Sequence, residues 1–302
     1  MRQPEFVYHP DYYCDIGNHV FRTEKYGLLY KKLINTSVLR PANLIKPTPA
    51  TREQLNLVHT TEYIDDLLAG RRTTRTQSSE MPISPEITRA FILGAGGTIE
   101  ACRTALLHHT GTMNLAGGFH HAYPGHAEGF CYINDVAVGI QDLLTEDLAA
   151  RPLIVDCDLH QGNGTAYIFR NTTNVYTLSI HQEQLYPPKE NGDCDIPLPN
   201  LCDGDRYIRK LRTPFVKALE THKPDFVLYV AGADPYRKDT LGSLSLTLDD
   251  MRSRDDLVIG ACMDQGIPVA VVLAGGYASD VHDTVQIHYQ TAQVLIDHWG
   301  SE

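Results

Sequence analysis

Short apolar runs rich in β-branched residues alternate along this chain with longer segments of helical period, and this alternation strongly limits the folds open to it. The runs predicted as buried strands are residues 6–8, 113–116, 153–156, 175–180, 226–230 and 269–274. Strands that alternate with helices usually become parallel neighbours in one sheet. The sequence therefore predicts an α/β fold, an open parallel sheet with helices on both faces.

The helical segments carry apolar residues at three- and four-residue spacing. One begins after Ser84 and Pro85, which suit an N-cap and a first helical position, and continues through Ile87 and Phe91. Other predicted helices are 135–148, 205–219, 248–265 and 279–299. The polar stretch 71–82 predicts a mobile loop, and no linker is long enough to divide the chain. We expect residues 1–302 to form a single domain.

Composition and charge exclude several classes of function. The chain has 302 residues, 42% of them hydrophobic, which supports a core that needs no disulfides. Its net charge is −11, and its densest basic group (Arg71, Arg72, Arg75) lacks aromatic neighbours, so we expect no nucleic-acid binding. No run approaches the ~20 apolar residues of a membrane span. The start lacks a signal-peptide pattern, and the seven cysteines are scattered, which predicts reduced thiols and a cytoplasmic location.

Metal-ligating side chains follow two of the predicted strands. One strand leads into Asp156, Asp158 and His160, whose alternation would place all three on one side before two glycines turn the chain. Another leads into Asp234. Two carboxylates and one imidazole from this group would leave a coordination position open, which is typical of a catalytic metal site. In an open parallel sheet, such groups meet at the carboxyl ends of the strands.

Groups suited to proton transfer and oxyanion binding follow two other strands. His120 and His121 form a pair that could act as base and acid near neutral pH. Gly275 and Gly276 let the backbone turn and bring Tyr277 to the edge of the sheet, where its hydroxyl could donate to a developing oxyanion.

Each feature also has an ordinary structural explanation. An Asp-x-Asp-x-His segment is more often a capped loop than a metal site, Asp234 could cap a helix, and Tyr277 could pack in the core. The position of the candidates favours the functional interpretation, because every one of them directly follows an apolar run.

At this point the motifs resemble the zinc-dependent histone deacetylases. The matching segments, in the family's order, are GGFHHA (117–122), GFCYINDVAVGI (129–140), DCDLHQGNG (156–164), LSIH (178–181), AGAD (231–234), LGSLSLT (241–247) and LAGGY (273–277). Weaker agreement in VYHPDY and LVHTTEY extends the resemblance over nearly the whole chain. The QGNG ending and ADPYRKDTLGSLSLT are most similar to the class IV branch and its short bacterial relatives. The resemblance implies an arginase/deacetylase-like fold.

The resemblance also implies a role for each matching residue in catalysis. Asp158, His160 and Asp234 match the zinc ligands, with Fe²⁺ as an alternative in the same donor set. His120 and His121 match the tandem histidines, and Tyr277 matches the tyrosine that polarises the scissile carbonyl. The other matches are Asp156, which orients His120 and forms a potassium site with main-chain groups near Asp158, His160, Ser179 and Ile180; Gly129 and Phe130, which line the acyl-lysine channel; Tyr186, on its opposite wall; and Gly275 and Gly276, next to the substrate.

Asn163 departs from the pattern of several family branches, which carry aspartate there to pair with the second histidine. A neutral amide can orient His121 with little charge stabilisation, so the imidazole should titrate lower than beside a carboxylate. Alternatively, Asn163 merely supports the glycine-rich turn.

The reaction that the resemblance implies is zinc-dependent removal of acyl groups, acetyl or longer, from lysine side chains of proteins or peptides by metal-activated water. An acylpolyamine amidohydrolase is the alternative, because such enzymes resemble this family in fold and metal site. The negative charge does not discriminate between the two, since it would favour either cationic substrate. An arginase-like ureohydrolase is disfavoured, since Gln161 and Asn163 are poor ligands for a second ion. A silent acyl-lysine binding module is disfavoured because His120, His121 and Tyr277 are retained. The sequence leaves the oligomeric state open.

Overall fold

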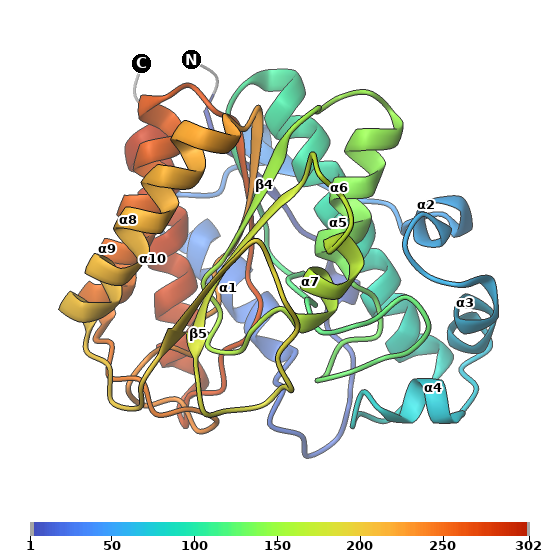
Figure 1. Ribbon diagram of the computed structural model, residues 1–302. Helices are drawn as coiled ribbons and strands as arrows, with labels where there is room; N and C mark the ends of the chain where they lie inside the picture. The colour runs from blue at the N-terminus through green and yellow to red at the C-terminus, as the bar shows by residue number, and fades with distance from the viewer. Residues whose placement is uncertain (1–2, 301–302) are drawn as a thin grey trace.

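A computed structural model of the chain describes residues 3–300 and contains one parallel sheet (Figure 1). Its strands lie in the order β2-β1-β3-β8-β7-β4-β5-β6. Their bounds are β1 Glu5–Val7, β2 Leu44–Ile45, β3 Gly111–Asn114, β4 Pro152–Asp156, β5 Tyr176–Gln182, β6 Cys194–Leu198, β7 Phe226–Val230 and β8 Val269–Val272. The predicted parallel sheet is confirmed, and each of the six expected strands is present within two residues of its expected bounds.

The helices lie on both faces of the sheet. In Figure 1, α8, α9 and α10 cover one face, and α5, α6 and α7 cover the other. The α-helices are α1 Glu24–Asn35, α2 Arg52–Asn56, α3 Thr61–Leu68, α4 Thr74–Gln77, α5 Pro85–His108, α6 Asp135–Thr145, α7 Asn163–Phe169, α8 Gly204–His222, α9 Leu248–Asp264 and α10 Val281–Trp299, with 3-10 turns at Pro10–Tyr12 and Pro41–Asn43. All five predicted helices are present.

The pleat of the central strands divides the core into two layers. Successive strand residues point to opposite faces, so Val227 and Tyr229 of β7 belong to the apolar cluster under α8 and α9. Phe226 and Leu228 belong to the cluster under α5 and α6. These strands are buried on both faces, which explains their continuous apolar sequence.

Helix α5 requires a correction to the expectation about membrane spans. Ser84 caps it by accepting from the Ile87 N–H, Pro85 occupies its first turn, and His109 ends it in a left-handed conformation. At 24 residues it is long and apolar enough to cross a bilayer, but 78% of its most apolar window is buried inside the protein. We therefore read it as a core helix, whose apolar residues are needed for packing.

Residues 71–82 are irregular, as their polarity predicts, except for the short helix α4 at residues 74–77. Asp66 of α3 anchors this stretch by accepting hydrogen bonds from Arg71, Thr73 and Arg75, at 2.6 to 3.1 Å. The buried Asp66 carboxylate thus holds in place a segment that has no apolar face to pack against the core.

The sequence pattern also missed both edge strands and several helices. Strands β2 and β6 are short or interrupted by polar residues and lie at the two edges of the sheet. Helix α7 begins at Asn163, where a turn was predicted. Position 164, inside this helix, requires glycine, because a Cβ there would come within 2.5 Å of the backbone of His121 and Ala122.

Candidate active site

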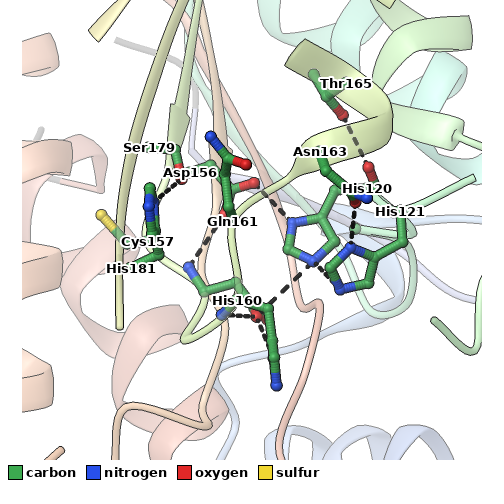
Figure 2. Close-up of polar contacts among 12 residues, drawn as sticks. His120, His121, Asp156, Cys157, His160, Gln161, Asn163, Thr165, Ser179 and His181 are labelled. Carbon is green, nitrogen blue, oxygen red and sulfur yellow. Dashed lines mark hydrogen bonds and ion pairs between the residues drawn. The ribbon is translucent and has the colours of Figure 1, made fainter. Parts of the chain in front are cut away.

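The predicted site residues come from the loops after β3, β4, β7 and β8. Because parallel strands end at one edge of the sheet, these four loops meet. The His120–His121 pair follows β3, Asp158 and His160 follow β4, Asp234 follows β7, and Tyr277 follows β8. Side chains far apart in the sequence are therefore neighbours (Figure 2).

Asp158, His160 and Asp234 form a buried cluster with the geometry of a metal site. One ligand atom from each lies within 4.8 Å of the others, and within residues 3–300 no other group of three His, Cys, Asp or Glu side chains meets this criterion. His160 Nδ1 is 3.2 Å from oxygens of both aspartates. The expected strand alternation is wrong, because β4 ends at Asp156 and the chain then bends. The bend, together with the end of β7, brings the three ligands together.

The electrostatics of this cluster favour a cation. Burial opposes the charged imidazole, but Asp158 and Asp234 raise the pKa of His160 to about 10. Burial and the charge of Asp158 raise the pKa of Asp234 to about 6. Asp234 Oδ2 is buried and has no well-aligned hydrogen-bond donor within residues 3–300, although His160 Nδ1 lies 3.2 Å away. An orphaned carboxylate oxygen facing a second carboxylate and an imidazole fits a divalent metal ion.

Two glycines allow the backbone to approach these carboxylates closely. A Cβ on Gly275 would lie 2.2 Å from Asp234 Oδ2, and one on Gly232 would lie 2.5 Å from Asp158 Oδ2. The Gly275 N–H donates to Asp158 Oδ2 at 2.8 Å. Gly275 thus packs against the carboxylates, and neither Gly275 nor Gly276 is among the lining residues of the cavity described below.

His120 is held by Asp156 at the end of β4. Its Nδ1 lies 2.6 Å from Asp156 Oδ2, and both side chains are buried (Figure 2). Burial alone would lower the pKa of His120, but the charges of Asp156 and Asp158 raise it to about 9. His120 is therefore positively charged at neutral pH.

His121 has the opposite character. Its Nδ1 lies 2.7 Å from Asn163 Oδ1, and its Nε2 lies 3.1 Å from His120 Nε2. Burial and the charges of His120 and His160 lower its pKa well below the ordinary value. The structure thus places Asn163 next to His121 as well as at the start of α7, so the two alternatives drawn from the sequence are compatible.

Tyr277 is held through its backbone. Its N–H donates to Asp239 at 2.6 Å, and its carbonyl accepts from the Thr240 hydroxyl at 2.8 Å. Burial and the charges of Asp234 and Asp158 raise the pKa of its phenol well above the ordinary value. The hydroxyl therefore keeps its proton and can act as a donor.

A cavity of about 300 Å³ opens above these groups. Phe130 contacts the Tyr277 ring at a centroid distance of 5.8 Å, whereas Tyr186 contacts His121 at 5.4 Å and His160 at 6.3 Å, so the two rings bound different sides. Its lining residues are Glu80, His121, Gly129, Phe130, His160, Leu185, Tyr186, Leu241 and Tyr277.

The wall at residues 129 and 130 has an unusual backbone. Gly129 and Phe130 have φ values of +50° and +62°, in the left-handed region that residues other than glycine rarely adopt. A Cβ on Gly129 would lie 2.5 Å from His121 and 2.8 Å from the Tyr186 hydroxyl. The strained conformation at Phe130 directs this wall into the cavity. Strained backbone of this kind often occurs at functional sites.

The residues expected around potassium lie behind the metal cluster. Asp156 pairs with Ser179 in the β4–β5 register, and Asp156 Oδ1 accepts from the Asp158 N–H at 3.1 Å. Ser179 Oγ lies 2.9 Å from His181 Nδ1, and the pKa of His181 is lowered to about 3, chiefly by burial. Ile180 continues β5.

The sequence pattern missed several residues of the site. Glu80, with φ of +63°, lines the mouth of the cavity, and Leu241 lines its wall. Asp239 and Thr240 hold Tyr277. Lys25, fully buried on α1, donates to the Ala274 carbonyl at 2.7 Å, and burial lowers its pKa to about 8. All but Lys25 lie in irregular segments without periodicity, and a lysine within a helix predicts exposure.

Comparison with known proteins gives consistent matches. The chain is 39% identical over 285 residues to an uncharacterized protein of Picosynechococcus, covering 93% of this chain and 95% of that one. It is 31% identical to the acetoin utilization protein AcuC of Bacillus subtilis and 28% identical to histone deacetylase 2 of Arabidopsis thaliana, covering 82% and 86% of this chain and 70% of each relative.

A solved structure and a family model extend these matches. The crystal structure of the HDA15 HD domain has the same fold, with a TM-score of 0.84 at 23% identity over 98% of this chain and 88% of that one. The family model for the histone deacetylase domain matches residues 19–292. With this match over nearly its full length, the chain belongs to the histone deacetylase family.

Proposed function

We propose that this protein is a zinc-dependent deacylase that hydrolyses acyl-lysine side chains in proteins or peptides. The observation that carries the proposal is a cavity with apolar walls and a polar floor. Phe130, Leu185, Tyr186 and Leu241 form apolar walls, whereas His121, His160 and Tyr277 contribute polar groups. An extended lysine chain with a terminal amide has this same division between apolar and polar parts.

A metal ion bound by the Asp158, His160 and Asp234 cluster would supply the electrophile in the proposed reaction. A Lewis-acidic ion held by Asp158, His160 and Asp234 would polarise the amide carbonyl and lower the pKa of water there. Zn²⁺ suits this donor set, and Fe²⁺ is the alternative because the ligand types alone do not discriminate between them. Potassium near Asp156 and Ser179 belongs to the same proposal, supported by the β4–β5 register that pairs these two residues.

The two histidines divide the proton chemistry. His121 lines the cavity and is neutral, so it can accept a proton from water and return it to the leaving amine. His120 does not line the cavity, and its positive charge beside His121 favours negative charge in the transition state. Tyr277 keeps its phenolic proton and can donate to the oxyanion.

An acylated polyamine is the second candidate substrate. Glu80 lines the mouth of the cavity, and a carboxylate there would favour an amine-bearing substrate. The class IV-like assignment within the family also remains a proposal, which rests on the QGNG and ADPYRKDTLGSLSLT segments.

One substrate panel tests both candidates. Protein stripped with a chelator and reloaded with Zn²⁺ or Fe²⁺ is assayed on peptides carrying acetyl- to myristoyl-lysine and on N-acetylated polyamines. We expect metal-dependent release of the lysine amine. Hydrolysis of polyamines alone would replace the first candidate by the second. Hydrolysis of neither class by the metal-replete protein would contradict both and favour a silent binding module.

A further inference from the structure

A carboxylate lies directly behind the neutral partner of His121. Glu128 Oε1 is 2.9 Å from Asn163 Nδ2, although the two residues are 35 positions apart. The Glu128 side chain is 21% exposed, and Asn163 is fully buried. The only other charged or titratable partners of this carboxylate within residues 3–300 are the Tyr186 hydroxyl, 3.1 Å from Oε1, and His126, 3.4 Å from Oε2. Asn163 is therefore not an isolated amide beside the histidine.

All polar groups of the Asn163 side chain are engaged. Its Nδ2 donates to Glu128 and, at 3.1 Å, to the Tyr123 hydroxyl, which itself donates to Glu190 at 3.2 Å. Its Oδ1 remains for His121 Nδ1 at 2.7 Å, a contact drawn in Figure 2. The amide has two donors and one acceptor oxygen, and each has a partner.

The chemistry of the carboxylate determines which way this amide points. An ionised carboxylate can only accept hydrogen bonds, so Glu128 requires the NH₂ end of Asn163. The Oδ1 end then faces His121, and it can only accept from Nδ1–H. In neutral His121 the proton therefore lies on Nδ1, and Nε2 carries the lone pair. His120 Nε2, 3.1 Å from His121 Nε2, favours the same tautomer from the other side of the ring when it carries a proton.

We propose that Glu128 is a positioning residue that sets the tautomer of His121 through the Asn163 amide. A carboxylate at position 163 would orient His121 directly. Glu128 takes part of this orienting role from one side chain further away, through Asn163. Its relevance to catalysis rests on the proposed function, because the base must present an unprotonated Nε2 to water. The same Oε1 accepts from Tyr186, so one carboxylate holds both the base and a wall of the cavity.

The tautomer of His121 is measured directly by NMR. Zinc-loaded protein labelled with ¹⁵N in histidine gives long-range ¹H–¹⁵N correlations that distinguish protonated from unprotonated ring nitrogens, and a His121→Gln spectrum assigns the signals. We expect Nδ1–H in the parent. In Glu128→Gln and Glu128→Met, the amide can reverse and present its NH₂ group to Nδ1, and only His120 then still favours the parent tautomer. We therefore expect a mixture of tautomers. We expect kcat/KM to fall about tenfold, part of the roughly 10²–10⁴ that a positioned base contributes.

A rescue variant separates this role from a general structural one. Asn163→Asp places a carboxylate beside His121, and this group can only accept hydrogen bonds. The new carboxylate also lies about 3 Å from Glu128, however, and the two negative charges repel each other. In Glu128→Gln/Asn163→Asp, the glutamine can donate to the new carboxylate. We expect this double variant to regain the parent's Nδ1–H tautomer and most of its kcat/KM, exceeding either single variant.

Tyr186→Phe is the matched control, because it removes the hydroxyl contact to Glu128 and leaves the Glu128–Asn163 contact intact. We expect the parent's tautomer in this variant. The proposal is wrong if the Glu128→Gln and Glu128→Met spectra both retain a single Nδ1–H tautomer, or if the double variant is no more active than Glu128→Gln. The NMR result does not depend on the substrate, so a parent with the expected tautomer but no deacylase activity would contradict only the proposed function.

Discussion

Individual residues in the metal cluster have few substitutes. Asp158, His160 and Asp234 are the candidate metal ligands, and within residues 3–300 no fourth His, Cys, Asp or Glu side chain places a ligand atom within 4.8 Å of all three. Each would therefore contribute about a third of the bonds between the protein and a bound metal ion, and the loss of one side chain would leave two ligands.

We predict that Asp158→Ala, His160→Ala or Asp234→Ala abolishes metal retention. The measurement is zinc stoichiometry by elemental analysis after extensive dialysis. Asp264→Ala, at the exposed end of α9, is the control and should retain the parent's stoichiometry. A cluster variant that binds zinc as tightly as the parent would remove that residue from the ligand set.

Tyr277 is expected to act on the transition state more than on the substrate. We predict that Tyr277→Phe keeps the metal and the fold but lowers kcat by about 10²–10³, the cost of one oxyanion donor. Steady-state kinetics on an acyl-lysine peptide should show a smaller change in KM than in kcat. An unchanged kcat would show that this phenol is not the donor.

Among the elements, the segment with α3 and α4 supports the wall of the cavity. The Arg75 carbonyl accepts from the Ala127 N–H at 2.8 Å, and the Ser79 carbonyl accepts from the Phe130 N–H at 3.0 Å. Asp66 anchors this segment through Arg71 and Arg75, and its side chain is only 5% exposed. The strained conformation of Phe130 therefore depends on a carboxylate outside the cavity lining.

We predict that Asp66→Ala raises KM several-fold, with a smaller change in kcat, and destabilises the fold by about 1–3 kcal/mol through lost charge-assisted hydrogen bonds. Hydrogen exchange should accelerate at residues 74–82 and 127–130. Asp65→Ala is the matched control, because the Asp65 side chain pairs within residues 3–300 only with Arg52, at 2.5 Å, and the pair is exposed. Equal effects of the two substitutions would show that Asp66 does not support the wall.

For the molecule as a whole, buried histidines make stability depend on pH. His59 is buried, with Nδ1 3.0 Å from the Tyr123 carbonyl and Nε2 accepting from the Asn134 N–H at 3.0 Å. Burial lowers its pKa to about 4. Between pH 4 and the ordinary histidine pKa of about 6.5, the unfolded chain binds a proton that the folded protein does not, so folding stability from His59 is lost as pH falls.

We predict that this loss reaches about 3 kcal/mol between pH 6.5 and pH 4. Asp239 opposes it: burial and Asp234 raise its pKa to about 7, so the folded protein binds this proton first and gains stability as pH falls. The measurement is therefore the difference in unfolding free energy between the parent and His59→Gln at each pH. The difference should shrink toward pH 4. A constant difference for His59→Gln would contradict the prediction.

The sequence alone determined the parallel sheet and most of the reactive groups. Apolar runs and helical periods repeat locally, and a reactive residue placed just after a buried parallel strand must lie at one edge of the sheet. Asp158, His160, Asp234, His120, His121 and Tyr277 could be identified on that basis together with the family resemblance.

Only the tertiary structure decided how these residues are held. The Glu128–Asn163 contact joins a loop to the first residue of α7, 35 positions away, and the Asp239–Tyr277 contact joins two irregular segments 38 positions apart. No local periodicity records which side chains such contacts bring together. Edge strand β6 and helix α7 were missed for a related reason. Their residues are ordered by neighbours in space, and the packing free energy of those neighbours outweighs the local preference of the chain.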